Sequence, residues 1–292
     1  MTINWFPGHM NKARRELGVA LARIDVVIEI LDARLPRSSR NPMLAELRGD
    51  TPAIPLLNKT DLADPEVTAQ WLDSFAAEEG SPALSISATD SDDAKRIPGL
   101  CKTLAPHRRG PGKTVRCMVV GIPNVGKSTL INTILGRRIA KVGDRPAVTK
   151  HQQQFELDRG VSVADTPGVL WPKLADQTGA YRLAASGAIR ETAFEVQDVA
   201  LFAACFLAER YPRALASRYK LDTVPLAGPE ILDALGRKRG FLKRGGVVDT
   251  ERAAEILLRE LRSGAIGPIS FETPADFADE TSPAPDSGHE QA

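Results

Sequence analysis

Short apolar runs and longer amphipathic stretches alternate through the first part of the chain. Runs typical of buried strands lie at 25–31, 53–57, 83–86, 115–120, 152–157 and 161–164. Helical patterns lie between most of them, at about 11–23, 65–79, 92–105 and 127–136. This alternation predicts an α/β fold with a mostly parallel six-stranded sheet and helices on both faces. The turn residues 158–160 predict a hairpin that adds one antiparallel edge strand.

From about residue 178 the pattern contains only helices, at 196–210, 228–236 and 250–262. We therefore expect an α/β domain at 1–177 and a small all-helical C-terminal domain at 178–271. Residues 272–292 carry six acidic residues, several Pro and Ser, and no Lys or Arg. We expect them to form a disordered acidic tail.

Composition changes this picture little. The net charge is +1, but without the tail 38 basic residues face 31 acidic ones, a balance compatible with nucleic acid. No apolar run approaches the roughly 18 residues that span a bilayer. The N-terminus has no secretion signal or lipidation motif, and the three cysteines have no metal or redox spacing. We expect a cytoplasmic protein without membrane contact.

A phosphate-binding motif, GxxxxGKS, occupies Gly121–Ser128 between a predicted strand and a predicted helix. Its glycines let backbone N–H groups surround phosphates at the start of the helix. Lys127 is expected to reach the β- and γ-phosphates, and Ser128 to ligate Mg²⁺. The other predicted nucleotide contacts are Asn124, Val125 and Gly126 in this segment and Thr129 directly after it.

A guanine-recognition motif, NKxD, follows the apolar run 53–57 as Asn58-Lys59-Thr60-Asp61. The Asp61 carboxylate can accept two N–H bonds from guanine, whereas adenine lacks that donor pair. Asn58 would bond the base or brace the loop, the Lys59 stem would cover the ring, and the Ser87-Ala88 backbone would contact the guanine oxygen. The alternative interpretation of residues 58–61 is a turn and helix cap.

A DxxG motif occupies Asp165–Gly168. Asp165 suits Mg²⁺ held through water, and the Gly168 N–H would meet the γ-phosphate. Thr149, in a polar loop between the motifs, is the candidate second Mg²⁺ ligand. Val169 stands where a Ras-like enzyme has a glutamine, and it cannot hydrogen-bond the attacking water.

The order of these motifs is unusual, because the guanine motif precedes the phosphate loop. It predicts a circularly permuted P-loop GTPase domain. The Pro- and Gly-rich segment 106–114 would join the original ends, and the new cut would follow DxxG.

Four segments, 5–10, 32–34, 38–41 and 165–172, together with the motif order, resemble the YlqF/RbgA family. That family consists of circularly permuted GTPases that assist late assembly of the large ribosomal subunit, and the resemblance runs from residue 4 to about 274. It implies that His9 takes over the role of the missing glutamine. It also implies binding to immature subunits in the GTP state, release after hydrolysis, and contact between the C-terminal domain and rRNA. Asn124 resembles the position that supplies an oxygen to K⁺ in potassium-stimulated GTPases.

A basic run, Arg237, Lys238, Arg239, Lys243 and Arg244, surrounds Phe241. Such runs contact RNA phosphates and offer a ring for base stacking, although many are only solvated faces. We therefore expect GTP or GDP, the large ribosomal subunit and its rRNA as partners of a monomeric GTPase. The alternative is a GTP-dependent regulatory switch that binds a protein partner without a ribosomal role.

Overall fold

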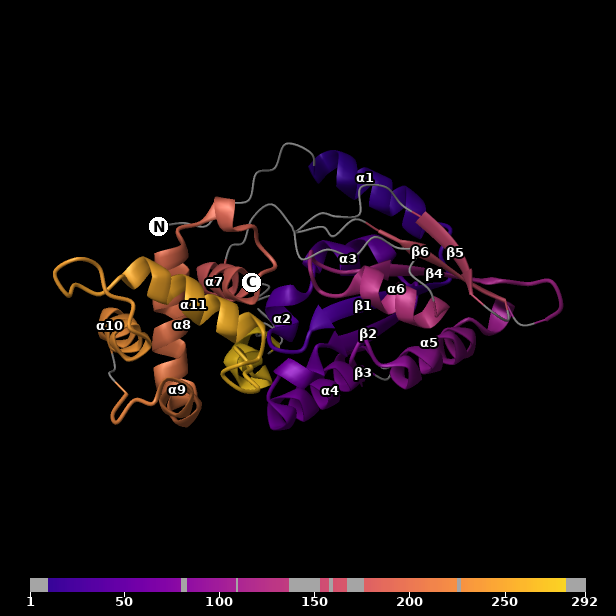
Figure 1. The fold of residues 1–292 in the computed structure, drawn as a ribbon. Helices are drawn as coiled ribbons and strands as arrows, with labels where there is room; N and C mark the ends of the chain where they lie inside the picture. Colours follow the sequence, from indigo (N-terminus) through magenta and orange to yellow (C-terminus); the bar gives the residue numbers. More distant parts are fainter. Residues whose placement is uncertain are drawn as a thin grey trace, which may run out of the picture.

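The computed structural model describes residues 10–79, 83–108, 110–136, 153–157, 160–166, 176–224 and 227–281. A sheet-containing lobe and a helical lobe lie side by side (Figure 1). His9, Thr149, Gly168 and Val169 lie outside the described residues. No helix in the described part of the chain is long and apolar enough to cross a membrane.

The sheet has six strands in the order β3-β2-β1-β4-β6-β5. All neighbouring pairs are parallel except β5 and β6. This confirms the predicted mostly parallel sheet with one antiparallel edge. The strands are β1 (Val26–Asp32), β2 (Ala53–Asn58), β3 (Leu84–Ile86), β4 (Val115–Val120), β5 (Gln153–Leu157) and β6 (Val161–Asp165).

Helices cover both faces because successive strand residues point to opposite sides. On β1, Val26 and Ile28 join the core beneath α5 and α6, whereas Val27 packs with Leu21 of α1 and Leu44 of α3. The helices and 3₁₀ turns of this lobe are α1 (Met10–Leu21), α2 (Pro36–Ser39), α3 (Pro42–Arg48), η1 (Thr60–Leu62), α4 (Pro65–Glu79), α5 (Ser91–Leu104), η2 (Pro106–Arg108) and α6 (Lys127–Leu135).

The helical lobe is built around α8, which contacts each of the other four helices of the lobe. Helices at 196–210 and 250–262 match the prediction, and α10 runs three residues beyond it. The short helices α7 and α9 were not predicted. The elements of this lobe are α7 (Gln177–Ser186), η3 (Glu191–Ala193), α8 (Val196–Arg210), α9 (Pro212–Tyr219), α10 (Gly228–Arg239) and α11 (Thr250–Arg262).

The chain after α11 returns to the sheet-containing lobe. The backbone N–H of Ile269 donates to the Leu62 carbonyl (2.9 Å), and that of Phe271 donates to the Arg34 carbonyl (2.6 Å). This segment therefore connects the two lobes beside the NKxD motif.

The expected start of the acidic tail at residue 272 is wrong. Glu272 is buried, and its carboxylate accepts bonds from the Ser38 backbone (2.9 Å) and Ser38 hydroxyl (2.5 Å). Arg182 adds an ion pair at 3.1 Å, and Trp71 Nε1 donates to the Glu272 carbonyl. A 3₁₀ helix, η4 (Pro274–Thr281), follows and contacts α4. Acidic composition alone could not reveal that a single carboxylate has buried partners. Residues 282–292 lie outside the described part.

Candidate functional site

The predicted motifs meet at one edge of the sheet because their strands run parallel and end together. In the register of β1 and β2, Asp32 lies beside Asn58; in that of β4 and β6, Val119 lies beside Asp165. Open α/β sheets bind ligands at this carboxyl edge.

The phosphate loop links β4 to α6 through two glycines that no other residue could replace without displacing neighbours. Gly121 has φ 151°, and a Cβ there would lie 2.5 Å from the Ile30 carbonyl oxygen. Gly126 has φ 108°, and its Cβ would lie 2.2 Å from Asn58 Nδ2. Positive φ and close backbone approach both require glycine. The α6 helix then begins at Lys127.

Asn58 connects the three predicted nucleotide motifs. Its Nδ2 donates to the Val125 carbonyl in the phosphate loop (2.7 Å), and its Oδ1 accepts from the Ala88 N–H (2.8 Å). Thr133 of α6 donates to the Ala88 carbonyl at 2.6 Å. Of the two roles considered for Asn58, bonding the base or bracing the loop, these contacts correspond to the second.

The loops around Ala88 and Asp61 are held by neighbouring polar groups. The Ser87 N–H donates to Asp93 Oδ2 (3.0 Å), and the Thr60 hydroxyl donates to the Ile86 carbonyl (3.1 Å). Asp61 lies in η1 with an exposed side chain. Thr129 lies in the first turn of α6.

Lys127 is buried in the phosphate loop. Its ammonium donates to the carbonyls of Gly121 (3.1 Å) and Ile122 (2.8 Å). Burial lowers its pKa to about 8, and the Asp165 carboxylate opposes that shift. A cation that is costly to bury is thus held by two carbonyls of the phosphate loop.

Two of the predicted metal ligands lie together. The Ser128 hydroxyl donates to Asp165 Oδ2 at 3.3 Å. A hydroxyl and a carboxylate oxygen side by side are the hard donors that Mg²⁺ accepts beside substrate phosphates. The residues present therefore fit that ion.

Lys59 has contacts that the motif alone does not predict. Its backbone is left-handed (φ 64°), and its ammonium donates to Asp32 Oδ2 at 2.9 Å. Arg34 binds the same carboxylate through two nitrogens, at 2.9 and 2.8 Å. In the sequence, Asp32 and Arg34 only contribute to the family resemblance. The available signal for their role is that they end or follow β1, the strand next to the NKxD strand β2.

Asn124, predicted as a nucleotide and potassium residue, also has a left-handed backbone (φ 58°). Its Nδ2 donates to the carbonyl of Gly187, which follows α7 in the helical lobe (2.9 Å). The phosphate loop therefore touches the second lobe directly.

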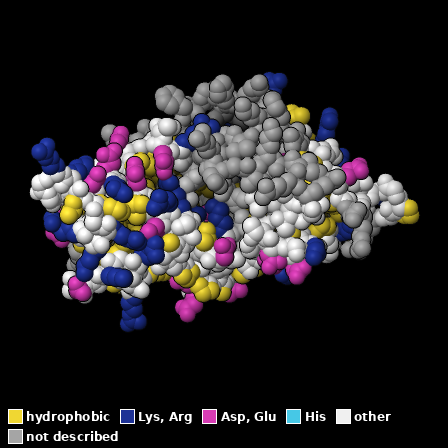
Figure 2. Space-filling view, viewed as in Figure 1, with side chains coloured by type: hydrophobic (Ala, Val, Ile, Leu, Met, Phe, Trp, Pro, Cys, Tyr) yellow, Lys and Arg dark blue, Asp and Glu magenta, His cyan; other side chains and the backbone are white. Residues whose placement is uncertain are grey.

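The basic run is divided among several local partners. Arg237 pairs with Asp233, Lys238 with Asp222, and Lys243 with Asp249, and the three cations are exposed. Arg239 binds Glu260 (3.0 Å) and lies over Tyr219. Arg244 is exposed on the loop after Gly240. Figure 2 shows Lys and Arg side chains over the helical lobe, mixed with acidic and hydrophobic ones.

The Phe241 ring, which the sequence predicts to be available for base stacking, is half-buried. The Arg252 guanidinium lies over it, 4.7 Å from the ring centre, and the ring packs against the core of the lobe. Sequence proximity to cations could not distinguish a free ring from a packed one.

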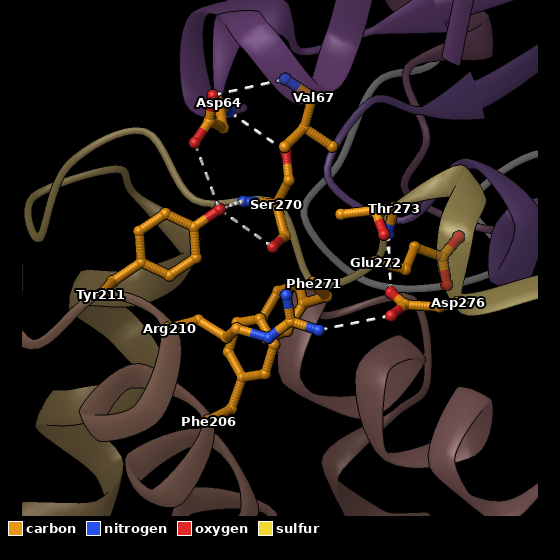
Figure 3. A pocket seen from close by; sticks show the side chains of 10 residues that line it. All are labelled: Asp64, Val67, Phe206, Arg210, Tyr211, Ser270, Phe271, Glu272, Thr273 and Asp276. Carbon is orange, nitrogen blue, oxygen red and sulfur yellow. Dashed lines mark hydrogen bonds and ion pairs between the residues drawn. The ribbon is translucent and has the colours of Figure 1, made fainter. Parts of the chain in front are cut away.

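A cavity of about 150 Å³ lies between the lobes (Figure 3). Tyr211 reaches into it, and its hydroxyl bonds the Ser270 backbone and Asp64. Arg210 pairs with Asp276 at 3.3 Å. These polar groups hydrogen-bond or pair with one another, and they come from both lobes. We therefore regard the cavity as part of the interface between the lobes. Asp64 comes three residues after Asp61 and links this interface to the NKxD loop.

The sheet order, the phosphate loop and the motif sequence define a circularly permuted P-loop GTPase. The family model for "50S ribosome-binding GTPase" matches residues 116–210. "Ribosome biogenesis GTPase A" of Priestia megaterium is 48% identical over 94% of this chain and 98% of that protein. The protein of the same name from Bacillus cereus is 45% identical over 96% and 97%.

Solved structures agree with these relatives. GNP-bound YlqF from T. maritima superposes with a TM-score of 0.64, at 29% identity over 90% of this chain and 98% of that one. A GDP-bound YlqF structure gives a TM-score of 0.65 at 27% identity. The chain therefore belongs to the ribosome biogenesis GTPase A (YlqF/RbgA) family, and it is a GTP-hydrolysing enzyme.

Proposed function

We propose that this GTPase assists assembly of the large ribosomal subunit, binds immature subunits and their rRNA in the GTP state, and leaves after hydrolysis. The observation that carries the proposal is similarity over nearly the whole length, helical lobe included, to proteins named for ribosome biogenesis. The family model's description, a 50S ribosome-binding GTPase, specifies the large subunit.

In this proposal Asp61 reads guanine, Asn58 and Lys59 shape the base pocket, and the Ser87-Ala88 backbone contacts the base oxygen. Gly126, Lys127, Ser128 and Thr129 bind the phosphates. The bonds from Asn58 to Val125 and Ala88 support this assignment, because they place the base and phosphate segments against one another.

Mg²⁺ would be held by Ser128 and Asp165, with Thr149 as a further ligand, and would neutralise phosphate charge when bound. The Gly168 N–H would contact the γ-phosphate. His9 would orient the attacking water in place of the glutamine that a Ras-like enzyme has where this chain has Val169. A potassium contact from Asn124 would use its Oδ1, because Nδ2 is directed to Gly187.

The helical lobe, proposed as a domain from about 178 to 271, would supply the rRNA contact. Arg237, Lys238, Lys243 and Arg244 are all exposed. Exposed ion pairs contribute little stability, so these cations can exchange their carboxylate partners for phosphates. Arg239 is the weaker candidate because Glu260 and Tyr219 already bind it.

The deciding experiment is co-sedimentation of the full-length protein with large subunits, with a non-hydrolysable GTP analogue or with GDP. Binding with the analogue alone, weakened by salt, is expected. Glutamine at 237, 238, 243 and 244 should weaken it and reduce the salt dependence. Glutamine at Lys95 and Arg96, exposed on α5 of the other lobe, removes two charges there and controls for charge loss away from the basic run.

If GTP-state binding to subunits is absent while GTP hydrolysis is intact, the alternative remains: a regulatory switch whose basic lobe contacts a protein. If both glutamine variants lose subunit binding equally, the 237–244 segment is not the specific contact with the subunit.

A further inference from the structure

A row of three charged side chains lies behind the NKxD loop. Lys59 contacts Asp32 at 2.9 Å, and Asp32 contacts Arg34 through both carboxylate oxygens and through the Arg34 backbone N–H (3.1 Å). The Asp32 and Arg34 side chains are 2% and 1% exposed. The Ala33 N–H between them donates to the Asn58 carbonyl at 2.8 Å, which ties the row to the start of the motif.

Burying this row is expensive, and ordinary stability does not require it. A buried ion pair is often no better for stability than apolar side chains of the same size. Burial would raise the Asp32 pKa, but the Arg34 and Lys59 charges outweigh burial and hold it well below its usual range. Asp32 is therefore a fixed anion directed at Lys59.

Arg34 is built into the surrounding structure more firmly than Lys59. Its guanidinium also donates to the Ser186 carbonyl (3.3 Å), and its own carbonyl accepts from Phe271. Its third guanidinium nitrogen, Nη1, is buried without a hydrogen-bond partner among the described residues. The Asp61 carboxylate is near enough to stabilise the Arg34 cation electrostatically. Lys59 feels the same carboxylate.

We propose that Asp32 and Arg34 are positioning residues for guanine recognition. Asp32 holds the Lys59 ammonium so that the lysine stem is already fixed beside the base. Arg34 holds Asp32 in place through two hydrogen bonds from its guanidinium. Neither residue touches the reacting phosphate. The proposal rests on the assignment of residues 58–61 to guanine and is independent of the ribosomal role.

The expected gain comes from preorganisation. Immobilising a long side chain during binding costs conformational entropy. The left-handed Lys59 backbone and the 2.9 Å contact fix that side chain before the nucleotide arrives. Removing the anion would move this ordering cost to the binding step, and it would leave the buried Arg34 cation and the half-buried Lys59 cation without their shared partner.

The test compares a ligand with a base and a ligand without one. Kd values for GDP and for inorganic tripolyphosphate are measured with full-length wild-type protein and Asp32→Asn. We expect GDP to bind roughly tenfold more weakly to the variant and tripolyphosphate to bind equally, since a charge-assisted hydrogen bond contributes about this much. Equal losses for both ligands would mean a general structural defect and would overturn the proposal.

A double-mutant cycle tests the route through Lys59. Lys59→Met alone should reproduce most of the GDP loss, and Asp32→Asn in that background should add little. Additive losses would overturn the assignment. If Asp32→Asn does not fold, Arg34→Lys keeps the charge but loses the two-nitrogen contact. It should then show the same preference for weakening GDP over tripolyphosphate.

Asp61→Asn tests the guanine assignment of residues 58–61 separately from the positioning role of Asp32 and Arg34. A switch from guanine to xanthine nucleotides would support the guanine assignment, whereas unchanged GDP affinity would remove it and the positioning proposal together. If the switch occurs but Asp32→Asn weakens both ligands equally, only the positioning proposal fails.

Discussion

The side-chain amide of Asn124 in the phosphate loop donates a 2.9 Å hydrogen bond to the carbonyl oxygen of Gly187, directly after α7. Arg34, behind the NKxD loop, donates to the preceding carbonyl, that of Ser186. Carbonyls at a helix end lack partners within the helix, so they accept such donors readily. One helix end of the second lobe therefore contacts both sides of the nucleotide site, and movement on either side should reach α7.

Replacing Asn124 with glycine should uncouple α7 from the phosphate loop. Glycine accepts the left-handed backbone at this position but removes the donor to Gly187. We expect the free energy of unfolding to fall by about 1 kcal/mol. Hydrogen exchange of residues 183–188 should differ between GTP-analogue and GDP states in the wild type, and this difference should shrink in Asn124→Gly.

Asn124→Asp is the matched control for shape. It keeps the size of the side chain but presents an acceptor to the Gly187 carbonyl, so its loss should exceed that of glycine. If the nucleotide-dependent difference in exchange at the end of α7 is unaltered in both variants, the Asn124–Gly187 hydrogen bond does not couple the phosphate loop to α7.

Lys127 should make nucleotide affinity depend on pH. Burial places its pKa near 8 in the free protein. Bound phosphates keep the ammonium charged, so above that pKa binding must take up a proton and affinity must fall. Between about pH 7 and pH 9 the Kd of a GTP analogue should rise about tenfold, with proton uptake on binding near pH 8. Calorimetry in two buffers of different ionisation enthalpy measures both quantities.

Lys127→Arg distinguishes this lysine from other titrating groups, because a guanidinium stays charged throughout the range. Its affinity should be weaker but nearly independent of pH. A pH profile as steep as that of the wild type would assign the proton to another residue.

The sheet was predictable because each of its strands is a local apolar run. The nucleotide site was predictable because its motifs directly follow strands, and the carboxyl ends of parallel strands lie together. The NKxD motif and the phosphate loop are far apart in sequence, but the strand ends place them together. What could not be predicted depends on distant partners. Asp32 gains its role from Lys59 and Arg34, and Glu272 is buried only because Ser38 and Arg182 receive it.

The missed helices have a similar explanation. Helix α7 begins with Asp176 as its N-cap, but its sequence is short and rich in alanine. Such a segment shows weak apolar periodicity and is stabilised mainly by packing against its neighbours. The local hydrophobic pattern therefore does not predict this helix.

Arg239 should behave as a structural residue within the basic run. It binds the Glu260 carboxylate and lies over the Tyr219 ring, 5.4 Å from its centre. Arg239→Gln should lower the free energy of unfolding by about 1–2 kcal/mol, through one charged hydrogen bond and one cation–π contact. Arg237→Gln, whose Asp233 partner is exposed, should leave thermal unfolding unchanged. Equal melting temperatures for the two variants would contradict the distinction.

Asp25 should anchor the segment that joins the original ends of the permuted domain. Its buried carboxylate accepts bonds from the Arg116 backbone (2.9 Å) and from Arg108 in η2 (3.0 Å). Burial would raise the pKa of Asp25, but the bonds from Arg116, Arg108 and His107 outweigh burial and hold it well below its usual range.

Asp25→Asn should therefore lower the free energy of unfolding by about 2 kcal/mol, because it removes the charge from a buried carboxylate that accepts several bonds from partly exposed cations. The sign of the pH dependence follows from a depressed carboxylate pKa. Its stabilisation is complete above the unfolded value of about 3.9 and is lost as pH falls below it. Wild-type stability should thus decline in acid more steeply than that of Asp25→Asn, in denaturant titrations across that range.

Asp92→Asn, which removes an exposed pair with Lys95, is the control expected to show no change. Parallel pH profiles for wild type and Asp25→Asn would mean that the linker is held by its other contacts and that Asp25 does not anchor it.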